Sequence, residues 1–360
     1  MRWLTLIALV ALCVIGCGQA ETTPEQPSSP PGLVPSESAP AQSPTASQVA
    51  VPPGWIAFDR YDAAFGAEGP YTGTMIIRPD GTDERSFAVP LTSFGLGAAW
   101  SRDGEQFVVN TWTEADQGGR PGVVDVDGSD FAKLVPDGVD GDFGCSDWHP
   151  DGNTLLCAMS GIDPDVDGIY TMRIDDLHLE RLTKSPFHFT EGSAGMCGGG
   201  ENRAIYSPDG TQIAYVRQRC GLGANPSADE SAAIVLMHPD GTDQRDLVEQ
   251  GRVKSHPGSQ ISWSPDGTSI AFGSQEGDLF LVDAETGVVT PIPLPADVGS
   301  HHADGPDWSP DGSRLVFSMF ADAQGETELY TIAPDGSDLR QITTDGGSEH
   351  WARWGPRLAD

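Results

Sequence analysis

Short apolar runs separated by turn residues recur along the chain from about residue 54 onward. Two of them are 270–272 (Ile-Ala-Phe) and 315–317 (Leu-Val-Phe), and each follows a turn made of Pro, Asp and Gly. Apolar positions that alternate within short runs, bounded by such turns, are typical of β-strands. The abundance of Gly (44) and Pro (29) agrees with many turns. The pattern therefore predicts an all-β chain.

The turn before these strands belongs to a repeated motif that reads aromatic-Ser-Pro-Asp-Gly. Its copies begin at Trp100, Trp148, Tyr206, Trp263 and Trp308, and a truncated copy begins at Trp354. Proline presets φ at the first central position of a tight turn, aspartate tolerates the second, and glycine closes it. Each copy thus predicts a hairpin, with the aromatic side chain free to pack between neighbouring sheets.

A second motif alternates with the first and consists of an apolar strand, an Asp-Gly turn and a polar strand. Its copies are 75–83, 123–130, 235–243 and 330–338, with degenerate versions at 170–182 and 280–292. Six copies of each motif predict six four-stranded units, because repetition at this spacing is typical of propellers and related arrays.

These repeats resemble those of the TolB-like (WD40-like, PD40) propeller family over residues 54–355. The resemblance implies a six-bladed β-propeller of four-stranded antiparallel blades. The first unit opens at Trp55–Phe58, which matches the second strand of a repeat. Its first strand is expected to come from His350–Trp354, so that the C-terminal strand joins the first blade and leaves no free sheet edge.

The same resemblance implies a function in binding. TolB binds a peptidoglycan-associated lipoprotein and other envelope proteins, and this chain is accordingly interpreted as a binding module for a protein, peptide or glycan. The alternative is a propeller enzyme, either a polysaccharide lyase or a hydrolase. The chain contains no Gly-x-Ser-x-Gly elbow and no phosphate-binding Gly-x-x-x-x-Gly-Lys loop, so no sequence motif favours catalysis.

The N-terminus carries an export signal. Arg2 precedes an apolar run, Leu4–Ile15, which is shorter than the roughly 20 residues needed to span a bilayer. The run ends in Val14-Ile15-Gly16-Cys17, which resembles the lipobox of bacterial lipoproteins. That resemblance implies a signal peptide at 1–16 and a lipidated Cys17 that anchors the protein outside the cytoplasm. An ordinary secretory signal is the alternative.

Three regions follow from these observations: the signal peptide at 1–16, a tether at 17–53 and the propeller at 54–360. The tether is rich in Pro, Ser, Thr and Gln. A segment of this composition buries too little apolar surface to fold, so we expect a disordered spacer.

The charge of the chain limits its partners. With 20 Lys and Arg against 53 Asp and Glu, the formal net charge is −33. Such a chain repels nucleic-acid phosphates and anionic lipids, so we expect no nucleic-acid partner and a membrane contact through the lipid anchor only. The acidity serves either solubility or the attraction of divalent cations or a basic partner.

Four cysteines remain beyond the anchor, and an even number in an exported protein suggests disulfides. When the repeats are aligned on their hairpin turns, Cys145 falls opposite Cys157, and Cys197 falls opposite Cys220. The alignment therefore predicts one disulfide within each of two blades. A structural metal is the competing interpretation, although no Cys-x-x-Cys pair supports it.

In propellers of this family, the connections into the innermost strands lie at one mouth of the central channel. Those connections carry several titratable residues, namely His188, Glu191, His256, His301, His302, Asp304, Glu349 and His350. Imidazoles and carboxylates from several blades could form a metal or acid–base site there. Alternatively, they are ordinary polar loop residues.

A second candidate site is the acidic segment 163–168 (Asp-Pro-Asp-Val-Asp-Gly). Asp163, Asp165 and Asp167 alternate as in the first half of a calcium-binding loop, but the closing Glu is absent. The alternatives are an irregular calcium site and a solvated acidic loop. No other cofactor is expected.

Overall fold

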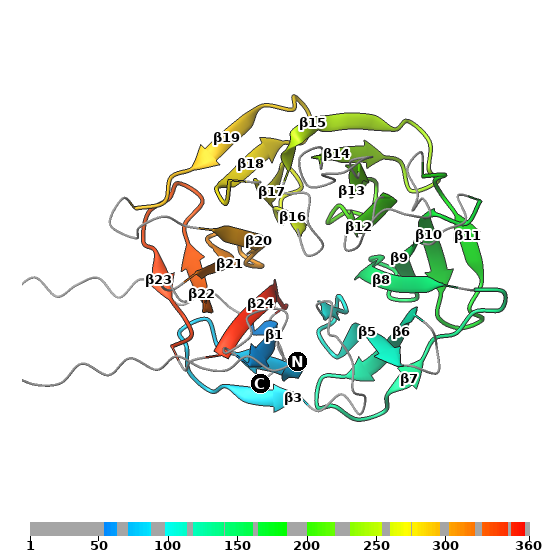
Figure 1. The fold of residues 1–360 in the computed structure, drawn as a ribbon, viewed down its shortest axis with the longest axis horizontal. Helices are drawn as coiled ribbons and strands as arrows, with labels where there is room; N and C mark the ends of the chain where they lie inside the picture. Colours follow the sequence, from blue (N-terminus) through cyan, green and yellow to red (C-terminus); the bar gives the residue numbers. More distant parts are fainter. Residues whose placement is uncertain are drawn as a thin grey trace, which may run out of the picture. The chain divides into compact units, whose positions relative to one another are not determined.

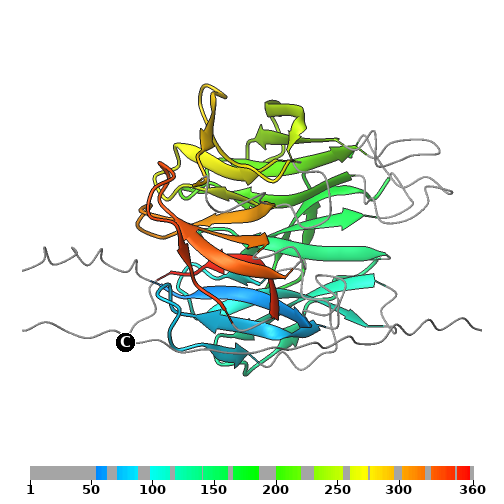
Figure 2. The same ribbon diagram turned by 60° about the vertical axis from the view of Figure 1, so that its left-hand side comes forward.

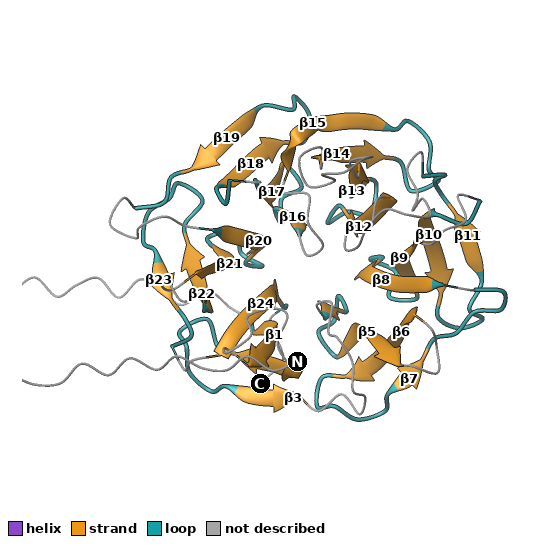
Figure 3. Ribbon diagram, in the orientation of Figure 1, coloured by secondary structure: helices purple, strands orange, loops and turns teal. Residues whose placement is uncertain are grey.

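The described part of the chain consists entirely of strands and their connections. The computed structural model describes residues 54–62, 71–87, 98–113, 118–139, 141–160, 165–185, 200–219, 231–253, 260–274, 276–295, 302–320, 326–344 and 347–356. No helix occurs among them (Figure 3), and accordingly none of these segments offers a helix that could cross a membrane. The chain divides into two units, Met1–Val49 and Ala50–Asp360, and all described residues belong to the second. The expected signal peptide, Cys17 and the tether lie outside the described residues.

Six four-stranded antiparallel sheets surround a central axis as the blades of a propeller (Figure 1). Blade 1 is β24-β1-β2-β3, and blades 2 to 6 are β4–β7, β8–β11, β12–β15, β16–β19 and β20–β23. The innermost strands are β24 (Gly347–Trp354), β4 (Ala99–Trp100), β8 (Asp142–Trp148), β12 (Gly200–Tyr206), β16 (Ile261–Trp263) and β20 (Ala303–Trp308). The prediction of six four-stranded blades is confirmed.

The remaining strands of each blade lead outward from the axis. The second strands are β1 (Ile56–Asp62), β5 (Gln106–Thr113), β9 (Thr154–Ser160), β13 (Ile213–Arg219), β17 (Ser269–Gly273) and β21 (Leu315–Phe320). The third strands are β2 (Tyr71–Ile77), β6 (Gly118–Asp125), β10 (Gly168–Arg173), β14 (Ser231–Met237), β18 (Leu279–Asp283) and β22 (Thr327–Ile332). The outermost strands are β3 (Arg85–Phe87), β7 (Ala132–Lys133), β11 (Leu179–Arg181), β15 (Arg245–Val253), β19 (Val289–Ile292) and β23 (Arg340–Gln341).

The C-terminal strand closes the ring, as the repeats predict. β24 pairs antiparallel with β1, from Ile56 opposite Trp354 to Asp62 opposite Gly347. Figures 1 and 2 show this red strand in the same sheet as the blue strands of blade 1, beside the orange strands of blade 6. The pairing satisfies the edge of β1, which would otherwise present unpaired backbone groups.

The repeated turn between the first two strands of a blade is held by bonds within the motif itself. In blade 5, the Gly267 N–H donates to the Ser264 carbonyl at 2.9 Å, and Gly267 has a φ of 71°. Asp266 Oδ1 accepts the Ser264 hydroxyl at 2.6 Å and the Thr268 N–H at 3.0 Å. Because every partner lies within five residues, each motif copy specifies its own turn locally.

The hydrophobic core lies between blades rather than in one central mass. Six clusters of buried side chains occur among the described residues, and each joins two neighbouring blades. Ile205 and Val216 of blade 4, for example, pack with Trp263 and Phe272 of blade 5. The motif aromatic therefore packs between neighbouring sheets, as expected, and burial of these faces holds the ring together.

One predicted disulfide is confirmed. Cys145 of β8 and Cys157 of β9 are opposite each other in the strand register and are joined by an S–S bond. Both are buried in the cluster between blades 2 and 3. Cys197 and Cys220 lie outside the described residues, so their pairing remains a prediction.

Removing this bond should lower the free energy of unfolding. The two cysteines are 12 residues apart, and closing a loop of this size stabilises a fold by about 2–3 kcal/mol. We expect a loss of this size when Cys145 and Cys157 are both replaced by alanine, measured by urea unfolding without reductant. Reductant should shift the wild type more than the variant. An equal shift in both would place the stabilising disulfide elsewhere.

Candidate functional site

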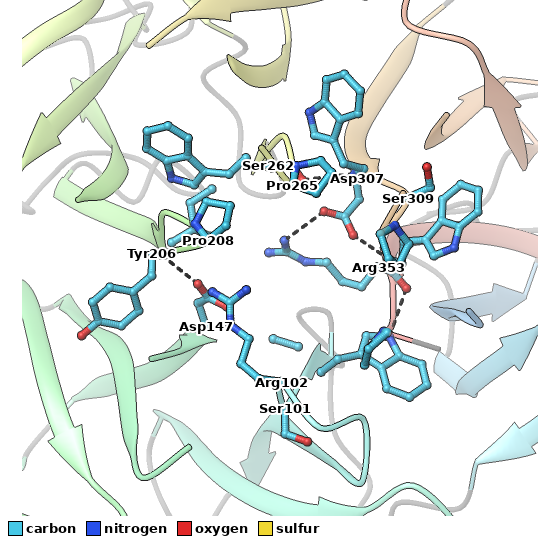
Figure 4. Close-up of a pocket in the computed structure, with 18 residues that line it drawn as sticks. Ser101, Arg102, Asp147, Tyr206, Pro208, Ser262, Pro265, Asp307, Ser309 and Arg353 are labelled. Carbon is cyan, nitrogen blue, oxygen red and sulfur yellow. Dashed lines mark hydrogen bonds and ion pairs between the residues drawn. The ribbon is translucent and has the colours of Figure 1, made fainter. Parts of the chain in front are cut away.

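A cavity of about 310 Å³ opens where the innermost strands end. All six blades contribute to its lining through the last residues of these strands and the turns that follow (Figure 4). Each blade supplies the residue just before the motif aromatic. These six equivalent residues are Ala99, Asp147, Ile205, Ser262, Asp307 and Arg353. A single repeat position thus forms the inner wall, and its chemistry differs from blade to blade.

In three blades the side chain of this wall residue also forms a hydrogen bond with the next blade. Asp147 Oδ2 accepts the Tyr206 N–H at 2.8 Å, Ser262 Oγ accepts the Trp308 N–H at 3.2 Å, and Asp307 Oδ2 accepts the Trp354 N–H at 2.6 Å. In each case the donor is the motif aromatic of the following blade. Three polar side chains of the wall therefore already form hydrogen bonds that join neighbouring blades.

The two wall aspartates are desolvated carboxyls. Burial raises the pKa of Asp147, although Arg102 and the Tyr206 N–H oppose the rise. Burial likewise raises the pKa of Asp307, against the effect of Arg353 and the hydrogen bond with Ser262, while the charge of Asp147 adds to the rise. Desolvation dominates because a charged carboxylate loses more hydration on burial than the neighbouring groups restore.

Two arginines face these aspartates. The Arg353 side chain is 12% exposed, and its Nη1 lies 3.7 Å from Asp307 Oδ1. Arg102 occupies the motif position where the other copies carry proline, and its side chain is exposed. Figure 4 shows the Arg353 guanidinium directed toward the middle of the cavity and the Arg102 guanidinium beside Asp147. The cavity thus combines two cationic and two acidic side chains.

Aromatic residues form the apolar part of the lining. Trp100, Trp263 and Trp354 are each no more than 8% exposed, and Trp308 is half-buried. The Trp100 indole N–H donates to the Arg353 carbonyl at 3.2 Å. The buried Trp263 and Trp308 indole nitrogens have no hydrogen-bond partner among the described residues. Trp100, Trp263 and Trp354 therefore present little open ring face to the cavity.

Of the titratable residues expected at a channel mouth, the four that the structure describes (His302, Asp304, Glu349 and His350) are not among the residues that line this cavity. They lie just before or in the first half of β20 and β24, whereas the cavity is at the ends of the innermost strands. His188, Glu191, His256 and His301 are outside the described residues. His302 is exposed and packs on Phe320, with ring centroids 5.6 Å apart. A site formed by the whole set stays a prediction.

The other described members of that set lie in blade 1 (Glu349 and His350) and in blade 6 (Asp304). His350 is half-buried, and its Nε2 lies 3.0 Å from Ser348 Oγ. Glu349 is fully buried and accepts a hydrogen bond from Arg60 Nε at 2.8 Å. Asp304, in β20, is half-buried. Glu349 therefore has a clear structural role in joining β24 to β1.

The described part of the acidic segment is in contact with basic side chains. Asp165 Oδ1 is 2.7 Å from Lys184 Nζ, and Arg181 donates to the backbone carbonyls of Asp165 and Asp167. Asp167 is buried, and Asp163 lies outside the described residues. No group of three His, Cys, Asp or Glu side chains in the described ranges is placed to hold a metal ion. A calcium site that includes Asp163 stays a prediction.

The most informative residues of the cavity were missed at the sequence level. The predicted site involved the loops that enter the innermost strands, whereas this cavity lies where those strands end. Two signals were present in the sequence. Arg102 is a departure from the motif proline, and the position before each aromatic carries Asp147, Asp307 or Arg353 where other copies carry Ala99 or Ile205.

Comparison with known proteins defines the fold. No protein-family model and no curated protein sequence matches the chain. Among solved structures it is similar to a putative TolB from Agrobacterium tumefaciens, with 17% identity, a TM-score of 0.56, and coverage of 86% of this chain and 100% of that one. A chain of a nidogen/laminin complex has 10% identity, a TM-score of 0.59, and coverage of 85% and 100%.

A hydrazine synthase from Kuenenia stuttgartiensis is also similar, with 12% identity, a TM-score of 0.57, and coverage of 86% of this chain and 48% of that one. The chain is therefore a six-bladed β-propeller with the fold of TolB-like propellers. Because this fold occurs both in a binding complex and in an enzyme, the function has to be argued from the site.

Proposed function

We propose that the protein is a lipid-anchored, extracytoplasmic binding module that presents the cavity at the ends of its innermost strands, called the mouth cavity below, to a protein, peptide or glycan partner in the cell envelope. The observation that carries the proposal is the cavity itself, to which each of the six blades contributes a charged or an aromatic side chain. Its volume of about 310 Å³ is at the lower end of the range for ligand sites. Such a volume accommodates one or two side chains or a single sugar.

The location follows from the N-terminal sequence. The Val14-Ile15-Gly16-Cys17 segment supports lipidation of Cys17, and the polar residues up to 53 provide a spacer. The net charge of −33 disfavours direct adhesion to anionic lipid, so the anchor alone would hold the protein at the membrane. The similarity to TolB and to a chain of a nidogen/laminin complex agrees with a role in binding.

Site-specific photo-cross-linking in bacterial cells tests both parts of the proposal. A photoreactive residue would replace Pro265, an exposed turn residue that lines the cavity. The turn tolerates a non-proline residue there, because Arg102 occupies the same place in blade 2. The matched control replaces Val288, which is 61% exposed in the turn between β18 and β19.

We expect cross-linking to a discrete envelope partner from position 265 and none from position 288. We also expect a Cys17→Ser variant of the same chain to leave the membrane fraction. Equal cross-linking from both positions, or none from either, would refute the mouth as the binding site. Membrane retention of the Cys17→Ser variant would refute the lipid anchor.

A further inference from the structure

We propose that the mouth cavity binds a single carboxylate of a peptide, and that Arg102 and Arg353 hold that group. The inference rests on the proposed binding function and specifies its ligand chemistry. Guanidinium groups bind carboxylates through two parallel N–H···O bonds, which fix the geometry as well as the charge. The site therefore requires arginine donors that the protein does not already use.

Comparison with two other shielded arginines, Arg60 and Arg314, shows that Arg353 has such donors. Arg60, with a side chain 14% exposed, donates to Glu349 and to both oxygens of Glu84. Arg314, 5% exposed, donates to Thr331 and Asp338. Arg353 is just as shielded at 12%, but its side chain donates no hydrogen bond to any residue of the described segments. A guanidinium withdrawn from water without acceptors is unfavourable, so a ligand that supplies acceptors would be stabilised there.

Arg102 provides the second set of donors. It forms no hydrogen bond or ion pair with the residues that the structure describes, and it lines the same cavity. In the other motif copies a proline suffices at this position, so the turn itself does not require an arginine. The substitution brings a long cationic side chain to the mouth.

Asp147 and Asp307, which face these arginines, do not accept hydrogen bonds from the guanidinium groups of Arg102 and Arg353 in the described segments. Asp147 Oδ2 and Asp307 Oδ2 accept backbone N–H groups from neighbouring blades. The Asp307–Arg353 contact of 3.7 Å is an ion pair without a hydrogen bond. The cavity therefore has an excess of unused donors, which matches a ligand that is an acceptor.

The lining favours a peptide carboxylate over the uronate of a glycan. A sugar ring commonly packs on an open aromatic face, but Trp100, Trp263 and Trp354 are at most 8% exposed. The overall charge of −33 would also repel a polyanionic glycan chain, whereas a single carboxylate needs only local compensation by the two arginines. A chain end and an Asp or Glu side chain share this chemistry, and both can enter a cavity of this volume.

Binding of small probes to the full chain in detergent micelles tests the inference. The probes are N-acetylglycine for a chain end, N-acetyl-glutamate α-amide for a side chain, N-acetyl-lysine amide for a cation and galacturonate for a glycan. Saturation-transfer NMR and tryptophan fluorescence would report binding. The variants are Arg102→Gln, Arg353→Gln and the double variant. The control is Arg173→Gln, which removes a 49% exposed arginine paired with Asp176 on blade 3.

We expect one or both peptide carboxylates to bind, with affinity about tenfold lower in each single cavity variant and unchanged in Arg173→Gln. Arg353→Lys keeps the charge but loses the paired guanidinium donors, so its affinity should lie between those of Arg353→Gln and the wild type. A graded loss of this kind separates loss of recognition from loss of folding. Unchanged affinity in the double variant, or tighter binding of the lysine amide or galacturonate, would overturn the inference. Carboxylate binding without cross-linking in cells would refute the envelope partner but not this site.

Discussion

Replacing Trp148 by alanine is expected to lower the free energy of unfolding by about 3–5 kcal/mol, the range for deletion of a large buried aromatic side chain. Trp148 is 1% exposed in the cluster between blades 2 and 3. Its indole N–H also donates to the Ala99 carbonyl of blade 2 at 3.1 Å. The substitution therefore leaves a cavity and removes a hydrogen bond between two blades at one interface of the ring.

Urea unfolding followed by circular dichroism would measure this loss, and the repeats offer a matched control. Trp308 occupies the same motif position in blade 6, but it is half-buried and its indole N–H has no partner among the described residues. Trp308→Ala should therefore cost clearly less than Trp148→Ala. Equal losses would mean that burial and the bond between blades do not determine the role of the motif aromatic.

The second large effect is a pH dependence of stability that originates at Glu349. This residue joins β24 to β1 through Arg60 and is fully buried. Burial raises the pKa of Glu349 to about 8; the hydrogen bond from Arg60 opposes the rise, and the nearby Glu328 carboxylate adds to it. Glu328 is itself 4% exposed, so two carboxyl groups share a desolvated site.

Because the pKa is higher in the folded state than in the unfolded chain, folding favours the protonated form of Glu349. The resulting stabilisation is complete below the unfolded pKa, about 4.5, and is lost as the pH rises through about 8. Glu349→Gln mimics the protonated form. We therefore expect the variant and the wild type to have similar free energies of unfolding near pH 5. Near pH 9 we expect the variant to be more stable by a few kcal/mol, since one pKa unit corresponds to about 1.4 kcal/mol.

The difference in unfolding free energy between variant and wild type, measured by urea unfolding across this pH range, gives the result directly. Glu84→Gln serves as the control, since Glu84 binds the same arginine but is 28% exposed. Its difference from the wild type should not grow with pH in the same way. If the difference in unfolding free energy for Glu349→Gln stays constant from pH 5 to 9, the raised pKa of Glu349 would be contradicted.

The sequence by itself determined the architecture of the described region. The turn bonds around Asp266 lie within five residues of one another, so the motif specifies a hairpin wherever it occurs. The number of motif copies therefore predicted the number of blades. The first unit lacks its first strand, which indicated that the C-terminal strand completes the first blade. The Cys145–Cys157 bond was predictable for the same reason, because the register around a tight turn is fixed locally.

Only the tertiary structure decided which residues share the cavity. Asp147, Asp307 and Arg353 are more than 40 residues apart along the chain, and they share a cavity because ring closure brings equivalent repeat positions to one axis. Burial then determined their chemistry, since desolvation and neighbouring charges depend on all the blades around the axis. In the same way, Glu349 was an expected site residue whose partner, Arg60, lies 289 residues away in sequence. Local patterns specify turns and strands because their bonds are local, whereas a site between blades depends on contacts that exist only after the ring has closed.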